Sequence, residues 1–136
     1  MALSKYNRGF VYMCLGCLAE VSFTSLKNFP ILEGKTQLWV FPLYYFGSIY
    51  GFEILYKYIK NKSIILRAFI YGIMILFIEY IAGYLIKKII GKCPWEYTNN
   101  FNVSGLINLS YLPLWSLVGL AAEYVNSYLN SIILKH

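Results

Sequence analysis

Four long apolar stretches alternate with short polar segments along the chain. They cover residues 9–26, 38–58, 64–86 and 106–133. Each is close to or above the roughly 20 residues that cross the hydrocarbon core of a bilayer as an α-helix. The pattern therefore predicts an all-α polytopic membrane protein, in which residues 1–136 form a single transmembrane domain built as a four-transmembrane-helix bundle.

The connector at residues 87–104 differs from the other, shorter connectors. Gly91 and Pro94 break a helix there. A mobile aqueous loop would be more polar than this segment. Its apolar and aromatic residues are Ile89, Ile90, Trp95, Tyr97 and Phe101. We predict an ordered interfacial loop between the third and fourth helices.

Composition supports a membrane environment. Hydrophobic residues make up 59% of the chain and charged residues 13%, whereas soluble domains contain about half and a quarter. The formal net charge is +6, but the basic residues form short clusters that flank the apolar stretches. Nucleic acid needs a concentrated basic surface instead. We expect a multi-pass protein of the cell membrane with the lipid bilayer as partner and no nucleic acid.

The distribution of Lys and Arg predicts the orientation. Lys5 and Arg8 precede the first apolar stretch as in a signal peptide, but we interpret that stretch as a true first helix. With the N-terminus in the cytoplasm, seven basic residues fall inside and five outside. Cytoplasmic segments carry the excess of basic residues, so we predict a cytoplasmic N-terminus with both termini on that side.

Each apolar stretch contains one glutamate. The four are Glu20, Glu53, Glu79 and Glu123. An ionised carboxylate in hydrocarbon costs several kcal/mol, so such residues face the bundle interior, pair, bind a ligand or take up a proton. Lys57 lies one helical turn after Glu53 and is its expected partner. Glu123 has both a structural and a functional interpretation.

Glu20 and Glu79 are the strongest functional candidates because neither has a basic residue at helical spacing. Small residues beside them, such as Gly16 and Gly83, allow neighbouring helices to approach. At about 1.5 Å per residue, both lie in the half of the membrane nearer Trp95. Two carboxylates brought together make a proton-sensitive or cation-binding site.

The remaining candidate residues give weaker evidence for a functional site. Trp95, Glu96 and Tyr97 place a carboxylate between two aromatic rings, which suits the cap of an aromatic-lined cavity or a cation contact. Cys14 and Cys17 form a C-x-x-C, but small residues at this spacing are more typical of helix packing. We predict no metal site and no catalytic residue, and the residues identify no cofactor.

The run IEYIAGYLIKKIIGKCPWEY, which ends at Tyr97, is followed by Asn102, Gly105, Leu109, Pro113 and Trp115. This pattern resembles the family of type IV ABC-transporter membrane proteins, and vertebrate transmembrane protein 229 is similar as well. Glu20 and the run GKTQLWVFPLYYFG also fit. The family motif reads Trp-Asp-Tyr, so Glu96 stands here in place of the Asp. The resemblance implies a small multi-pass membrane protein with polar residues grouped around Glu20, Glu79 and the Trp95–Tyr97 loop.

The residues and the resemblance together give one set of candidate ligand-binding residues: Glu20, Glu79, Trp95, Glu96, Tyr97, Asn102 and Glu123. The leading hypothesis is a protein that binds or transports a small cation, or an amine-bearing or lipid-like ligand, through an acidic cavity within the membrane. The lack of a P-loop means that ATP-driven transport would need another chain.

Two alternatives stay open at this point. An intramembrane enzyme acting on a lipid would use Glu79 or Glu20 as general base with Glu96 as partner. It would need a nucleophile or a metal within reach of these carboxylates. A structural subunit would instead use its glutamates to dock a partner, either a second copy in a homo-oligomer or another membrane subunit.

Overall fold

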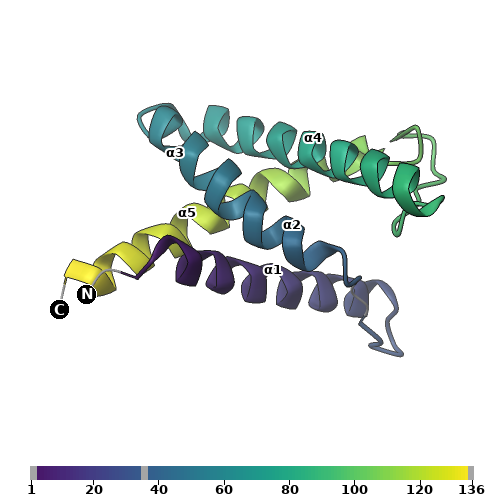
Figure 1. Ribbon diagram of the computed structural model, residues 1–136, viewed down its shortest axis with the longest axis horizontal. Helices are drawn as coiled ribbons and strands as arrows, with labels where there is room; N and C mark the ends of the chain where they lie inside the picture. The colour runs from purple at the N-terminus through teal and green to yellow at the C-terminus, as the bar shows by residue number, and fades with distance from the viewer. Residues whose placement is uncertain (1–2, 35–36, 135–136) are drawn as a thin grey trace.

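The computed structural model describes residues 3–34 and 37–134, and within them the chain forms four helical rods (Figure 1). The first rod is α1 (Lys5–Lys27). The second is continuous and consists of α2 (Val40–Phe46), a π-helical segment η1 (Gly47–Phe52) and α3 (Glu53–Ile59). The third is α4 (Ile64–Ile90) and the fourth is α5 (Leu112–Leu134). The predicted mainly helical fold is thereby confirmed. Lys35 and Lys135, which are among the basic residues counted for the orientation, lie outside the described residues.

Local signals set the helix ends. The side chain of Ser4 accepts a hydrogen bond from Asn7 N at the start of α1, and that of Ser63 accepts one from Leu66 N at the start of α4. Gly91 ends α4 in the left-handed region at φ 85°, a conformation that glycine adopts without strain. The predicted end at residue 86 was too early, because Lys87 and Lys88 are good helix formers and are favoured in a last turn.

The fourth helix begins later than predicted. Residues 106–111 do not belong to it, because β1 (Asn102–Val103) and β2 (Ile107–Asn108) pair antiparallel and a 3-10 turn, η2 (Leu109–Tyr111), follows. Ser104 and Gly105 both adopt positive φ, 55° and 69°, and so make the tight turn of this hairpin. An apolar run in a hairpin looks like part of a helix when only hydropathy is considered.

The connector between α4 and α5 is folded. Tyr97 N donates to Gly105 O at 2.9 Å, and the indole N–H of Trp95 donates to Leu106 O at 3.1 Å. Leu106 and Ile107 are buried. Hydrogen bonds and burial together hold this segment against the end of α4.

The rods pack as two pairs, α4 with α5 and α1 with the α2–α3 rod. Glycines allow the close approach. A Cβ at Gly72 or Gly119 of the first pair would overlap side chains of the facing helix, and a Cβ at Gly16 would lie 2.7 Å from the Tyr44 ring. Buried residues then join the two pairs: Tyr12, Phe52, Ile59, Tyr71 and Leu129.

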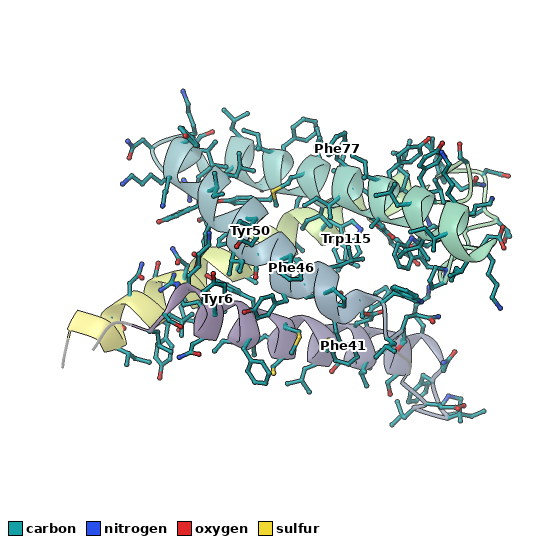
Figure 2. All side chains as sticks on the ribbon, in the orientation of Figure 1. Tyr6, Phe41, Phe46, Tyr50, Phe77 and Trp115 are labelled. Carbon is teal, nitrogen blue, oxygen red and sulfur yellow. The ribbon has the colours of Figure 1, made fainter. Side chains whose placement is uncertain are left out.

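Many apolar side chains of α1 and α4 are exposed on the outside of the molecule. Among the described helices, α1 and α4 are long and apolar enough to cross a membrane, yet only 11% and 17% of their most apolar windows are buried. Leu18 and Phe77, for example, are 63% and 64% exposed, and Figure 2 shows Phe77 on the outer side of α4. A core helix of a soluble protein would bury such residues.

Figure 1 shows that α1 begins and α5 ends at the same end of the molecule, and the α3–α4 turn lies at that end too. The α1–α2 loop and the hairpin lie at the other end. We call these the turn end and the hairpin end.

Candidate functional site

The hairpin end places a tyrosine hydroxyl on the Glu79 carboxylate. Glu79 lies on α4, and Tyr97 Oη donates to its Oε1 at 2.7 Å. The backbone bond from Tyr97 N to Gly105 O fixes the tyrosine over the end of the helix. The connector thus supplies a neutral donor to a carboxylate that lies within an apolar helix.

Glu20 lies on α1 in the same region. Tyr44 Oη, from α2, makes a long 3.4 Å contact with Glu20 Oε2, and the absence of a side chain at Gly16 lets the Tyr44 ring lie against α1. Burial raises the pKa of the Tyr97 hydroxyl, and the negative charges of Glu79 and of Glu20 raise it further. Both carboxylates lie within electrostatic range of this hydroxyl, and we call these two residues with Tyr44 and Tyr97 the glutamate cluster.

Trp115 completes the surroundings of Glu79. Its indole N–H lies near the Glu79 carboxylate but not in hydrogen-bonding geometry. Glu79 Oε2 and Trp115 Nε1 are both buried, and neither has a hydrogen-bond partner among the described residues. In Figure 2, Trp115 projects from α5 into the region between α4 and α2. One acceptor and one donor are therefore left open beside the same carboxylate.

A second layer closes this end of the molecule. Lys27 Nζ donates to Tyr111 Oη at 2.8 Å, and the Tyr97 and Tyr111 rings meet edge to face with centroids 5.9 Å apart. Gln37 Nε2 donates to Pro94 O at 3.0 Å. These contacts tie the end of α1 and the α1–α2 loop to the connector between α4 and α5.

Three other residues predicted for the site serve to build the connector. The ring nitrogen of Trp95 lies near Gly83 of α4 and donates to Leu106 O. Asn102 accepts from Gly105 N at 3.0 Å and donates to Asn99 O, so it closes the turn. Glu96 is exposed, and its carboxylate lies beside Gly105. Of the Trp95–Tyr97 motif, only Tyr97 contacts Glu79 through a hydrogen bond.

Glu53 and Glu123 lie toward the turn end and have arginine partners. Arg8 Nε contacts Glu53 Oε1 at 2.7 Å. The predicted pairing of Glu53 with Lys57 was wrong, because Glu53 faces α1 across the interior while Lys57 is exposed. Arg67 holds Glu123 through two hydrogen bonds of 2.8 and 3.1 Å, and Tyr71 Oη adds a third at 2.6 Å.

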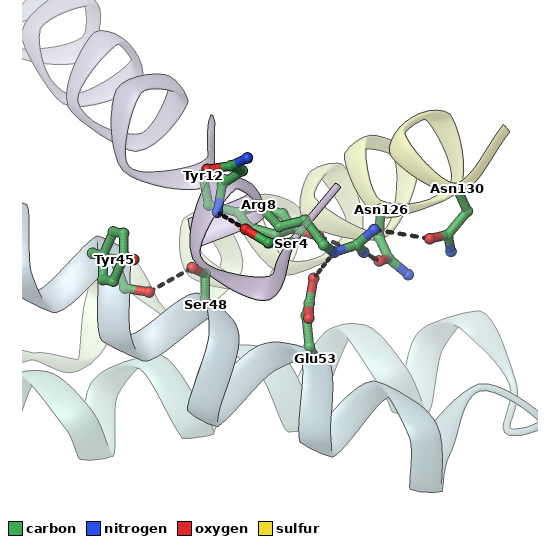
Figure 3. A network of polar contacts seen from close by, with 9 residues as sticks. Ser4, Arg8, Tyr12, Tyr45, Ser48, Glu53, Asn126 and Asn130 are labelled. Carbon is green, nitrogen blue, oxygen red and sulfur yellow. Dashed lines mark hydrogen bonds and ion pairs between the residues drawn. The ribbon is translucent and has the colours of Figure 1, made fainter. Parts of the chain in front are cut away.

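Figure 3 shows the larger network around Arg8. The guanidinium also donates to Oδ1 of Asn130 at 2.9 Å and to Oδ1 of Asn126, both on α5. It is 9% exposed, and Asn126 is 5% exposed. One side chain of α1 thereby joins the α2–α3 rod to α5.

The structure gives no support for an open acidic cavity. Neither of two surface hollows found among the described residues is lined by Glu20 or Glu79. One is apolar and lies between the α2–η1 segment and α4. The other lies around the Arg8 network. Tyr44 and Tyr97 contact Glu20 and Glu79 directly.

The site predicted from the sequence did not include four residues at the hairpin end, Tyr44, Tyr111, Trp115 and Lys27. Arg8 was not predicted as the partner of Glu53. The chain has 14 tyrosines, and aromatic belts at membrane interfaces account for most such residues. Nothing local distinguishes Tyr44 or Tyr111 from the others. Trp115 had one signal, its place in the family pattern.

Comparison with known proteins gives a family and no structural template. No solved structure matches the chain. The model of one family matches residues 9–136, which include both glutamates of the hairpin end and the whole connector. The chain therefore belongs to the family described as putative ABC-transporter type IV.

Proposed function

We propose that this protein crosses the membrane four times and binds a small cation or an amine-bearing ligand at the cluster of Glu20 and Glu79. One observation carries the proposal. Tyr97 holds one oxygen of the Glu79 carboxylate, while the other oxygen is buried and has no hydrogen-bond partner among the described residues. A buried carboxylate with an open acceptor favours a positively charged group beside it, and an ammonium group with an N–H would also donate a hydrogen bond to it.

The length and pairing of the other two rods support four crossings. The segments α2, η1 and α3 together contain 20 residues, which makes a helix about 30 Å long, the thickness of a hydrocarbon core. The polar residues of α5 are bonded inside the bundle, Glu123 to Arg67 and Asn126 to Arg8. Their contacts offset the cost of placing them in a membrane.

The aromatic groups around Glu79 suit an amine. Tyr97 and Trp115 surround the carboxylate with one hydroxyl and one indole. Both present a polar O–H or N–H to the carboxylate and leave its negative charge available to an ammonium group. The family description supports a role connected with transport, and ATP-driven transport would need a partner chain because this sequence has no P-loop.

Ligand-induced stabilisation tests the proposal. Purified protein in neutral detergent is titrated with sodium chloride, ethanolamine or choline, and thermal unfolding is followed. A ligand bound to the folded state at 100 times its Kd adds about 2.7 kcal/mol of stability. We expect saturable stabilisation by at least one of these cations in the wild type and in Glu96→Gln, whose changed carboxylate is exposed.

Glu79→Gln should lose that stabilisation while it still folds, because glutamine keeps the shape of the side chain and removes its charge. Equal stabilisation of Glu79→Gln and wild type would contradict the proposal. So would the absence of stabilisation by all three cations. An intramembrane enzyme that uses Glu79 as a base stays the alternative proposal, and it requires turnover of a lipid that depends on Glu79.

A further inference from the structure

A polar groove lies toward the turn end, away from the glutamate cluster. Its volume is about 310 Å³, within the roughly 300–1,000 Å³ of small-molecule sites. It is lined by Arg8, Glu53, Tyr56, Lys57, Asn126 and Asn130. Three rods contribute to it, so its shape depends on the folded bundle.

Arg8 fixes the direction of the two amides in the groove. A guanidinium has only donors, and Arg8 donates to Oδ1 of both Asn126 and Asn130. The two amide NH₂ groups therefore point away from Arg8. The same guanidinium is paired with Glu53, which balances the one negative charge in the lining.

Two more donors line the groove. The Tyr56 hydroxyl and the Lys57 ammonium have no hydrogen-bond or ion-pair partner among the described residues. With Arg8 and Glu53 paired, Lys57 gives the lining a net positive charge. A set of open donors with one positive charge matches a group that only accepts, and phosphate oxygens have this property.

The surroundings of the groove are basic as well. Lys60 and Lys62 follow Lys57 directly after the end of α3. On α1, Lys5 Nζ lies 3.9 Å from the centroid of the Tyr50 ring. Each basic residue near an anionic membrane surface adds about 1 kcal/mol of attraction. In the four-crossing arrangement, the groove lies where helices end and headgroups begin.

We propose that this groove binds a phosphate group through Tyr56, Lys57, Asn126 and Asn130, with Arg8 positioning the two amides. The phosphate can belong to an anionic lipid headgroup or to a free phosphate. The proposal rests on four crossings only for the position of the groove at the membrane surface. Its chemistry is independent of the cation site at Glu79.

The test uses the full chain in two settings. In phosphatidylcholine nanodiscs, thermal stability is compared with and without phosphatidic acid. In neutral detergent, inorganic phosphate is titrated against chloride at equal ionic strength. Stabilisation in the nanodiscs alone supports a lipid headgroup, and stabilisation by inorganic phosphate supports a free phosphate. No stabilisation in either setting overturns the proposal.

Neutral and charged variants separate a built site from general surface attraction. Tyr56→Phe removes one hydroxyl without a change in charge, and loss of one hydrogen bond of about 1 kcal/mol weakens binding about fivefold. Lys57→Gln should weaken it about fivefold or more. The matched controls are Tyr58→Phe and Lys60→Gln, whose parent residues are exposed and outside the lining.

We expect Tyr58→Phe to equal the wild type and Lys60→Gln to lose less than Lys57→Gln. If Tyr56→Phe binds like Tyr58→Phe, and the two lysine variants lose equally, only the general charge of the surface attracts phosphate and the groove is not a site. Glu79→Gln should bind phosphate like the wild type, so failure of the cation site and failure of this site can be told apart.

Discussion

The half-buried glutamates have different partners at the two ends of the molecule. Toward the turn end, Glu53 and Glu123 each pair with an arginine at 2.7–2.8 Å. At the hairpin end, the hydrogen bond to Glu79 comes from a neutral tyrosine, and one carboxylate oxygen stays open. An arginine compensates both the charge and the geometry of a carboxylate, whereas a tyrosine compensates only part of the geometry.

This difference supports a structural role for the glutamates paired with arginine and a ligand-binding role for Glu79. A carboxylate with its own arginine needs nothing from outside the protein. A carboxylate held by neutral donors keeps its affinity for a cation or a proton. We therefore interpret Glu53 and Glu123 as ties between helices and Glu79 as the ligand-binding group.

The largest effect is expected at the turn end. Arg8→Met should destabilise the protein by about 3–5 kcal/mol, because it leaves Glu53 without its partner in a largely buried position. Denaturant unfolding in detergent measures this loss. The double variant Arg8→Met/Glu53→Gln should recover much of it, since the uncompensated charge is gone. If the double variant is as unstable as Arg8→Met, Arg8 acts through packing and its amide contacts rather than through the ion pair.

At the hairpin end, Tyr97→Phe should cost about 1.5–3 kcal/mol, the worth of a hydrogen bond to a charged group. The change removes the 2.7 Å bond and leaves Glu79 Oε1 without its donor. The matched control is Tyr84→Phe, whose parent residue is exposed on the same helix as Glu79. Equal stability of the two variants would show that the bond to Glu79 adds nothing to folding.

A smaller effect follows from the raised pKa of Tyr97. Its ordinary value is 10.0, and burial together with the nearby carboxylates raises it in the folded state. The unfolded chain therefore loses the Tyr97 proton first as the pH rises. The contribution of Tyr97 to stability is complete below about pH 10 and falls above it, by at most about 1.4 kcal/mol per pH unit.

Unfolding curves measured on both sides of pH 10 test this dependence. As the pH rises above about 10, the free energy of unfolding of Tyr97→Phe should fall less steeply than that of the wild type. The difference in slope corresponds to the loss of at most one proton. Parallel curves for the two proteins would mean that the Tyr97 hydroxyl titrates alike in both states.

The smallest effect is expected for Glu79→Gln without ligand. Its stability should equal or slightly exceed that of the wild type, because burying an amide costs less than burying a charge. Glu123→Gln should instead destabilise the protein, since it leaves the charge of Arg67 uncompensated. A loss of the same size in both variants, measured by denaturant unfolding, would remove the difference between the two ends.

Much of the fold was predictable because apolar runs and helix-ending residues act locally. The runs located the four rods, although α4 continues past the predicted end at residue 86 as far as Ile90, just before Gly91. The start of α5 was not predictable from hydropathy, because residues 106–111 continue the apolar stretch that forms the helix. Their hairpin depends on the positive φ of Ser104 and Gly105 and on pairing across the turn.

The candidate site was also predictable only in part. The cost of a carboxylate in an apolar run singled out Glu20 and Glu79 from the sequence alone. Their tyrosine partners come from α2 and from the connector, which lie 24 and 18 residues away along the chain. No local pattern marks such partners among 14 tyrosines.

The sequence by itself determined that this chain is built of apolar helices and that four glutamates lie within them, because hydropathy and charge are properties of each position. Only the tertiary structure decided which glutamates are compensated. Arg8 lies 45 residues from Glu53 and Arg67 lies 56 residues from Glu123, so packing of the rods creates both ion pairs. The same packing gives Glu79 a tyrosine and no arginine among the described residues, because the close helix contacts place the connector, and not a basic helix end, over that carboxylate.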